Sequence, residues 1–164
     1  MTGAPFTIRP LESGDHAWAL DMVRGWGGTD YMVSRGRVIP AAALPGFCAV
    51  RPDGERVGLA LYEPAGREWQ LVVLEAGERF TGIGTTLVAV VRAAAASAGC
   101  RRLWLVTTND NLDALRFYQR RGFEVAAVHR DLREVARRLK PSIPLVGEFG
   151  IPIVSEIELE MRLG

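Results

Sequence analysis

The segment at residues 79–85, with the sequence RFTGIGT, constrains the fold of this chain more than any other feature. It stands between a β-prone run at 69–74 and a long run with helical apolar spacing that starts at Ile83. Its two glycines leave backbone N–H groups uncovered, and the start of a helix adds the positive end of the helix dipole. Arg79 adds a full positive charge. The segment therefore predicts a strand, a loop that holds a phosphate or pyrophosphate, and a helix, in that order.

Two other kinds of phosphate-binding loop do not fit this segment. A Walker A loop needs Gly-Lys followed by Ser or Thr, whereas here Gly84 is followed by Thr85 and Thr86. A dinucleotide-binding fingerprint needs a third glycine and an acidic residue about 20 positions on, but this chain has Leu87 and then an apolar stretch at 104–106. The remaining alternative is a loop whose glycines only permit a tight turn into the helix.

The rest of the chain predicts an α/β fold with a central mixed, mostly antiparallel sheet and helices on both faces. The length of 164 residues favours a single domain over 1–164. Residues 25–45 have no clean period and are expected to be irregular with one helical turn, and 141–152 are expected to form a shaped loop. Strands are expected at 6–9, 47–50, 56–62, 69–74, 102–108, 124–129 and 153–163, and helices at about 15–25, 83–98, 112–121 and 131–140.

Charge and composition argue against several classes of partner. The net charge of +1 comes from 20 basic and 19 acidic residues spread along the chain, so we expect no nucleic-acid partner. No apolar run approaches about 18 residues and no signal segment is evident, so we expect no membrane partner and a cytoplasmic location. Cys48 and Cys100 lie far apart and away from the two histidines, which predicts neither a disulfide framework nor a metal site. The abundance of Ala, Arg, Gly and Val favours a bacterial source.

A second motif lies at 109–123, with the sequence NDNLDALRFYQRRGF. The two motifs, in this order, resemble those of the GNAT superfamily of acyl-CoA N-acyltransferases. Its first signature is Arg or Gln, two residues, Gly, one residue, and Gly or Ala, which Arg79, Gly82 and Gly84 match. The resemblance covers about 6–128, and the tail at 139–153 resembles a bacterial subgroup of the family.

The resemblance implies a function. It implies an acetyltransferase that moves an acetyl group from acetyl-CoA to a primary amine of a small molecule or peptide, by direct transfer in a ternary complex. Acetyl-CoA and the amine are then the partners, no metal is required, and the protein is a monomer or a homodimer. The alternative is a CoA-binding sensor or interaction module with little or no turnover.

The resemblance also implies where acetyl-CoA binds. The pantetheine arm would lie in a gap between 69–74 and 103–106, and main-chain N–H groups near Val73 and Leu74 would hold the acyl carbonyl oxygen. Asn109 would contact the pantetheine, or a bridging water, or would only cap the next helix. The pyrophosphate would rest on the loop residues Arg79, Phe80, Thr81, Gly82, Ile83, Gly84 and Thr85.

Tyr118 is the candidate general acid, because the family places a tyrosine hydroxyl beside the departing thiolate. The alternative is a tyrosine that only packs the core. Glu75, at the end of the central strand and near the expected acyl site, is the candidate general base for the ammonium of the acceptor, while Gln70 occupies the position at which the family most often suggests an acid. The alternative is that Glu75 is an ordinary solvated charge in a loop. Glu148, in the tail loop, is the second candidate for the base.

Trp26 and Tyr31 lie in the region where this family shapes its acceptor pocket, although core packing explains them equally well. The loop at 141–152 is expected to form a lid over that pocket. In this interpretation Glu148 meets the ammonium of the acceptor, while Phe149, with Leu145 and Val146, excludes water. The alternative is a loop that covers a sheet edge.

Overall fold

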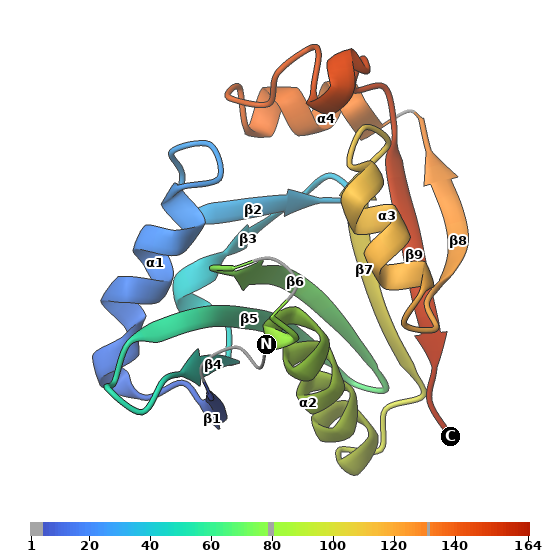
Figure 1. Ribbon diagram of the computed structural model, residues 1–164. Coiled ribbons are helices and arrows are strands. Elements are labelled where there is room, and N and C mark those ends of the chain that lie inside the picture. The colour runs from blue at the N-terminus through green and yellow to red at the C-terminus, as the bar shows by residue number, and fades with distance from the viewer. Residues whose placement is uncertain (1–4, 79–80, 131) are drawn as a thin grey trace.

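The computed structural model describes residues 5–78, 81–130 and 132–164. Its centre is a seven-stranded sheet with the strand order β1-β4-β5-β6-β7-β9-β8 (Figure 1). Neighbouring strands run antiparallel except β6 and β7, which run parallel. The expected mixed, mostly antiparallel sheet is therefore confirmed. The strands are β1 (Thr7–Pro10), β4 (Gly46–Val50), β5 (Arg56–Ala65), β6 (Glu68–Ala76), β7 (Arg102–Thr108), β8 (Glu124–His129) and β9 (Glu156–Arg162).

One face of the sheet packs against α2 (Ile83–Ser97). The apolar side chains of this helix recur every three or four positions, so they form one buried stripe over β4, β5 and β6. Gly58 on β5 permits this close packing, because a Cβ there would lie 2.5 Å from a methyl carbon of Ile83. The helix and the sheet therefore fix where the glycine-rich loop meets the end of β6.

The opposite face is covered by α1 (His16–Arg24) and by a hairpin of β2 (Tyr31–Ser34) and β3 (Arg37–Pro40). The expectation that 25–45 would be irregular is wrong. The hairpin turns at Arg35 and Gly36, which have φ of 51° and 75°, and two left-handed residues suit the right-handed twist of the paired strands. Each strand has only four residues, so its alternation was too short to stand out in the sequence.

β6 and β7 pair only at their beginnings, through Glu68–Gln70 and Arg102–Trp104, and then diverge. A β-bulge lies just beyond this point, because Leu61 and Tyr62 of β5 pair with Val73 and Leu71, which leaves Val72 as an extra residue. The extra residue reverses the alternation of side chains along β6. Leu71 packs on the α2 side, whereas Val73 packs on the α1 side.

The C-terminal half of the chain forms the part of the sheet that lies beyond β6. β9 pairs with β7 over its whole length and with the edge strand β8. α3 (Leu112–Gln119) follows β7, and α4 (Leu132–Leu139) lies across the end of the molecule above it in Figure 1. Because α4 contacts β2, segments from the two ends of the chain lie next to each other.

Candidate active site

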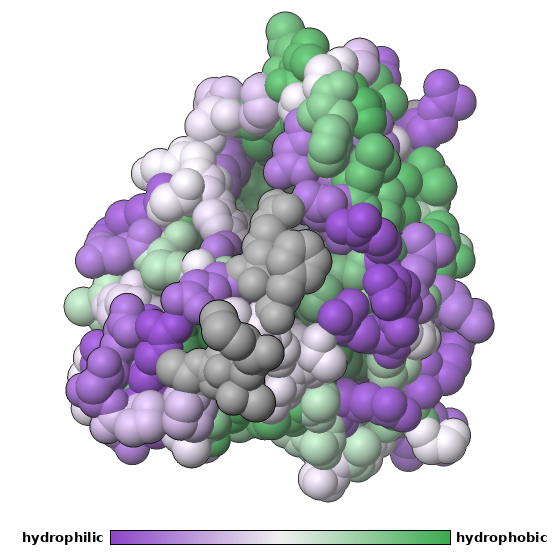
Figure 2. Space-filling model, viewed as in Figure 1, coloured by the Kyte–Doolittle hydropathy of each residue, from purple (hydrophilic) through white to green (hydrophobic). Residues whose placement is uncertain are grey.

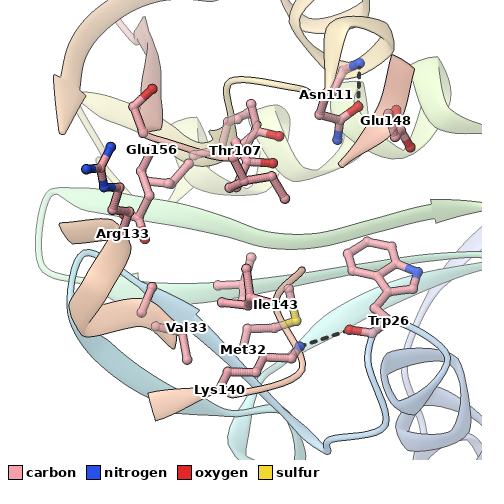
Figure 3. Close-up of a pocket in the computed structure, with 18 of the residues that line it drawn as sticks. Trp26, Met32, Val33, Thr107, Asn111, Arg133, Lys140, Ile143, Glu148 and Glu156 are labelled. Atoms are coloured by element: carbon pink, nitrogen blue, oxygen red, sulfur yellow. Dashed lines mark hydrogen bonds between the residues drawn. The ribbon is translucent and has the colours of Figure 1, made fainter. Parts of the chain in front are cut away.

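A cavity of about 590 Å³ opens where β6 and β7 diverge. The resemblance implies a gap between 69–74 and 103–106, and the cavity lies there. Its walls come from β6, β7 and α3, and from β2, α4 and the segment after α4 (Figure 3). Figure 3 shows Thr107 and Asn111 on one side of it, with Met32 and Lys140 across from them.

Glu75 lines this cavity and is held by Trp26. The indole Nε1 of Trp26 donates a hydrogen bond of 2.8 Å to a carboxylate oxygen of Glu75, although the residues lie 49 positions apart. The bulge at Val72 makes this contact possible, because it places Glu75 on the α1 face of the sheet with Val73. Glu75, the candidate base, and Trp26, a candidate residue of the acceptor pocket, therefore lie in direct contact.

The main chain of β6 near Val73 and Leu74 lies along the cavity. Leu74 lines the wall, and the Val73 side chain is buried in the core on the α1 side. Beyond Gln70 the edge of β6 that faces β7 has no strand partner. Backbone groups on that edge are left to bond a ligand, as an oxyanion site requires.

Tyr118, on α3, contributes both a packed ring and a hydroxyl group to the site. Its ring packs edge-on against Phe117 and Phe123, with centroid distances of 5.1 and 5.4 Å. The residue lines the cavity, and its hydroxyl bonds to none of the described residues. Burial raises the pKa of Tyr118 well above its ordinary value, so the hydroxyl stays protonated at neutral pH. A protonated phenol in the cavity is a suitable proton donor.

The glycine-rich loop lies partly within the described structure. Arg79 and Phe80 fall outside the described residues. Gly82 is the N-cap of α2 and has a φ of 83°, a conformation that favours glycine. In the first turn, the N–H groups of Ile83, Gly84 and Thr85 have no acceptor among the described residues. The helix start therefore has the features of an anion site.

The remaining loop positions have structural contacts of their own. The Thr81 hydroxyl donates to the Glu78 carbonyl at 3.0 Å. A Cβ on Gly84 would lie 3.3 Å from the Phe117 ring, so glycine here also permits α2 to approach α3. A substitution at Gly84 would thus disturb packing as well as any phosphate contact.

Arg121 is a cation at this helix start that the sequence did not suggest. Its Nε and one terminal nitrogen donate to the Thr85 hydroxyl at 2.9 and 2.8 Å. Its guanidinium stacks on Phe117, 3.6 Å from the ring centroid. Because its partner lies 36 positions away, no local motif marks the contact.

The structure does not bring Asn109 into the cavity. Its Oδ1 accepts from the N–H groups of Val154 and Ser155 at 2.9 and 3.1 Å, and its Nδ2 donates to the Pro152 carbonyl at 2.9 Å. Nor does it cap α3, since that role belongs to Asn111, which accepts from the Ala114 N–H at 3.1 Å. Asn109 instead ties the end of β7 to the chain before β9, and Asn111 lines the cavity.

Of the side chains expected at the pocket from the loop at 141–152, only Glu148 lines the cavity. Glu148 lines the cavity, and its N–H donates to the buried carboxylate of Asp110 at 2.9 Å. Phe149 lies outside the cavity wall with 67% of its surface exposed, and Leu145 and Val146 are also exposed. The expectation that these three side chains exclude water from the pocket is therefore wrong. Figure 2 shows apolar side chains gathered at the top of the molecule, where Figure 1 places this loop.

Tyr31 also lies away from the cavity wall, and its hydroxyl donates to the Leu139 carbonyl at 2.8 Å. It thus fastens β2 to the end of α4. Lys140, which the sequence reading did not select, does line the cavity and is only 6% exposed. Its Nζ donates to the Trp26 carbonyl at 2.9 Å (Figure 3). The apolar spacing predicted α4 but gave no sign that this lysine points inward.

The described residues hold neither a cluster suited to a metal ion nor a helix suited to a membrane. Within 5–78, 81–130 and 132–164, no group of three or more His, Cys, Asp or Glu side chains is arranged to hold a metal ion. No helix in the same ranges is long and apolar enough to cross a membrane.

The sequence matches the acetyltransferase (GNAT) family over residues 17–123, more than half of the chain. The chain belongs to this family. Over 132 residues it is 42% identical to the uncharacterized protein YdhI of Bacillus subtilis (strain 168), which covers 80% of this chain and 82% of YdhI. It is 33% identical over 138 residues to YxbD of the same organism, covering 84% and 86% of the two chains.

Solved structures of GNAT acetyltransferases share the fold. One is a GNAT family acetyltransferase from Elizabethkingia anophelis with acetyl-CoA bound, with a TM-score of 0.71, 19% identity and coverage of 96% of this chain and 98% of the other. Another is a Bacillus subtilis acetyltransferase in complex with CoA, with a TM-score of 0.71, 19% identity and coverage of 98% and 100%. At these identities the likeness establishes the fold.

Proposed function

We propose that this GNAT member transfers an acetyl group from acetyl-CoA to a primary amine, directly and within one ternary complex. One observation carries the proposal: Glu75 from β6 and Tyr118 from α3 line the same cavity, where β6 and β7 diverge. Amine acylation needs a base and an acid, and in this cleft the carboxylate can serve as the base and the protonated phenol as the acid.

Binding of acetyl-CoA is supported by the start of α2. The N–H groups of its first turn have no acceptor among the described residues, and with the nearby guanidinium of Arg121 they suit the pyrophosphate. The Elizabethkingia anophelis and Bacillus subtilis proteins hold acetyl-CoA and CoA on the same fold. When bound, acetyl-CoA supplies the thioester carbonyl carbon that the amine attacks.

In this proposal each residue of the site has a defined role in the reaction. Glu75 accepts a proton from the acceptor's ammonium and passes it to solvent, and Trp26 keeps its carboxylate oriented. Main-chain N–H groups near Val73 and Leu74 hold the carbonyl oxygen. As the N–C bond forms and the C–S bond breaks, Tyr118 protonates the leaving sulfur, and the second proton from the nitrogen restores the phenol.

Direct transfer is favoured over an acyl-cysteine route by the positions of the thiols. Cys48 and Cys100 are buried at 0% and 5% exposure, and neither lines the cavity. Burial also raises the pKa of both thiols, which lowers the fraction of reactive thiolate.

A screen of primary amines with acetyl-CoA, read as free thiol and as product mass, tests this function. At least one amine should raise thiol release above the rate of acetyl-CoA hydrolysis, with an acetylamide as product. Glu75→Gln should lower that rate while acetyl-CoA still binds. Tight acetyl-CoA binding with no amine-dependent release across small amines and peptides would favour a CoA-binding module instead.

A further inference from the structure

A buried ammonium group lines the cavity and has no acidic partner among the residues that the structure describes. Lys140 is 6% exposed, and its Nζ donates to the carbonyl of Trp26 at 2.9 Å. Among the described residues no carboxylate pairs with it. Burial lowers the pKa of Lys140, because the charged form loses its hydration. Since an unpaired buried charge is costly, an anion that enters with a ligand would bind here favourably.

Lys140 belongs to a cationic wall of the cavity. Arg133, Arg137 and Lys140 all line it, and their spacing of four and then three positions places them on one face of α4 and its continuation. The contacts of the two arginines with acids are weak, since they share the exposed carboxylate of Glu134 at 3.6 and 3.5 Å. Arg137 also donates to the Ile153 carbonyl at 2.6 Å, so it holds the following loop as well.

Acidic residues line other walls of the same cavity. They are Glu75 on β6, Glu148 in the tail loop and Glu156 on β9. Glu156 accepts from the Arg35 N–H at 3.1 Å, and burial raises its pKa, which favours the neutral form. The cavity therefore has acidic side chains that can bind a cation, and on the α4 wall it has basic side chains that can bind an anion.

Trp26 forms a hydrogen bond with an acidic residue of the cavity and another with a basic one. Its indole N–H donates to Glu75 at 2.8 Å, and its carbonyl accepts from Lys140 at 2.9 Å. The carboxylate and the ammonium are thus both bonded to Trp26, one at its indole and the other at its main-chain carbonyl. One small molecule could therefore contact both groups at once.

We propose that the acceptor is a small primary amine that also carries a carboxylate, that is, an amino acid or a close derivative. This inference rests on the proposed function. The amine lies beside Glu75, where it loses its proton, and the carboxylate pairs with Lys140, with Arg133 as a second cation. A polyamine would instead bring positive charge to a wall that already carries three cations.

The test is a panel of matched acceptors, in which each amino acid is compared with its carboxamide and with its decarboxylated amine. The wild-type protein should give the amino acid a kcat/KM at least about tenfold higher, mainly through a lower KM, because a charge-assisted pair is worth about that factor. Lys140→Met should reduce the preference several-fold, and Lys140→Arg, which keeps the charge, should retain most of it. Arg138→Met is the matched control, because Arg138 lies near the end of α4, two positions before Lys140, is exposed and does not line the cavity.

Each result of this experiment either supports or overturns the inference. Turnover of carboxamides or diamines as fast as amino acids would overturn it and leave the proposed function standing, and so would an unchanged preference in Lys140→Met. Acetylation of Lys140 itself, found by peptide mass, would also overturn it. If Lys140→Met fails to fold, the wild-type preference alone decides. If no amine is acetylated, the proposed function fails and the inference fails with it.

Discussion

At the scale of single residues, Tyr118 has two separable parts. Its ring packs against Phe117 and Phe123, and its hydroxyl lines the cavity without a partner among the described residues. A core residue needs only the ring, whereas a proton donor needs the hydroxyl. Removing the oxygen alone therefore distinguishes the two roles.

Tyr118→Phe keeps the packed ring and deletes the proton donor. Turnover should fall by roughly 10 to 1,000-fold, the range typical for loss of a general acid. The melting temperature and the Kd for acetyl-CoA should change little, as checked by thermal unfolding and calorimetry. A loss of stability in step with the loss of activity would support a role in packing only.

Arg121 should act on the nucleotide part of acetyl-CoA. Arg121→Met removes a cation beside the first turn of α2, so the Kd for acetyl-CoA should rise by about tenfold. Acetyl-pantetheine lacks the pyrophosphate, and its binding should not change. The neighbouring exposed residue gives the control variant Arg120→Met. Equal weakening of both ligands would show that Arg121 serves the fold rather than the phosphate.

Local patterns point to some residues of the cavity and not to others, for a physical reason. Tyr118 belongs to the second motif and Glu75 to a strand end, and both line the cavity. Lys140 and Arg121 bond to partners 114 and 36 positions away, which no local pattern encodes. The expected cap of α3 is Asn111 rather than Asn109, because the partners of Asn109 lie in the segment before β9.

At the scale of elements, the bulge in β6 and its divergence from β7 determine which residues of β6 line the cavity. The apolar run at 69–74 predicted the strand, yet nothing in its sequence marks Val72 as the extra residue. The bulge depends on the pairing of Leu61 and Tyr62 with the facing strand, which is a tertiary property.

A charged cluster joins the first elements of the chain. The carboxylate of Asp15, 1% exposed, accepts from Arg9 at 2.6 and 3.0 Å, from Arg56 at 2.7 Å and from the Glu12 N–H at 2.8 Å. These bonds link β1, the turn before α1, and β5. The Arg9 guanidinium is the main cause that holds the pKa of Asp15 well below its usual range.

This cluster should make the fold sensitive to acid. Because the pKa of Asp15 is lower in the folded state, its stabilisation is present above the unfolded value of about 3.9 and is lost as the pH falls below it. Asp15→Asn should lower the free energy of unfolding at pH 7 by roughly 1–3 kcal/mol and flatten its fall with acid. Denaturant unfolding at pH 7 and below pH 4 measures both effects. An unchanged acid dependence in the variant would contradict this account.

At the scale of the whole molecule, the cavity joins parts of the chain that are remote in sequence. Trp26 and β2 form one side, and α4 with the loop after it forms another. The order of predicted strands and helices was enough for the sheet and its covering helices. It was not enough for the side formed by β2, α4 and the tail loop, because β2 has only four residues and the tail loop has no regular period.

Acetyl-CoA should stabilise the whole fold if it binds at the β6–β7 cleft. At about 100 times its Kd it adds roughly 2.7 kcal/mol to the free energy of unfolding, which raises the melting temperature by several degrees. NADH at the same concentration serves as the control, since the loop lacks a dinucleotide fingerprint. An equal shift with NADH, or none with acetyl-CoA, would contradict the assignment of the α2 start as the pyrophosphate site.

The most direct test of the account is a single turnover with isotopically labelled acetyl-CoA, an amine that the screen identifies, and excess protein. Mass spectrometry should find one labelled acetylamide for each free CoA thiol, and no label on the protein at any time. Label that appears first on the protein and then on the amine would contradict direct transfer. Thiol release that is the same with and without the amine would contradict amine acetylation itself.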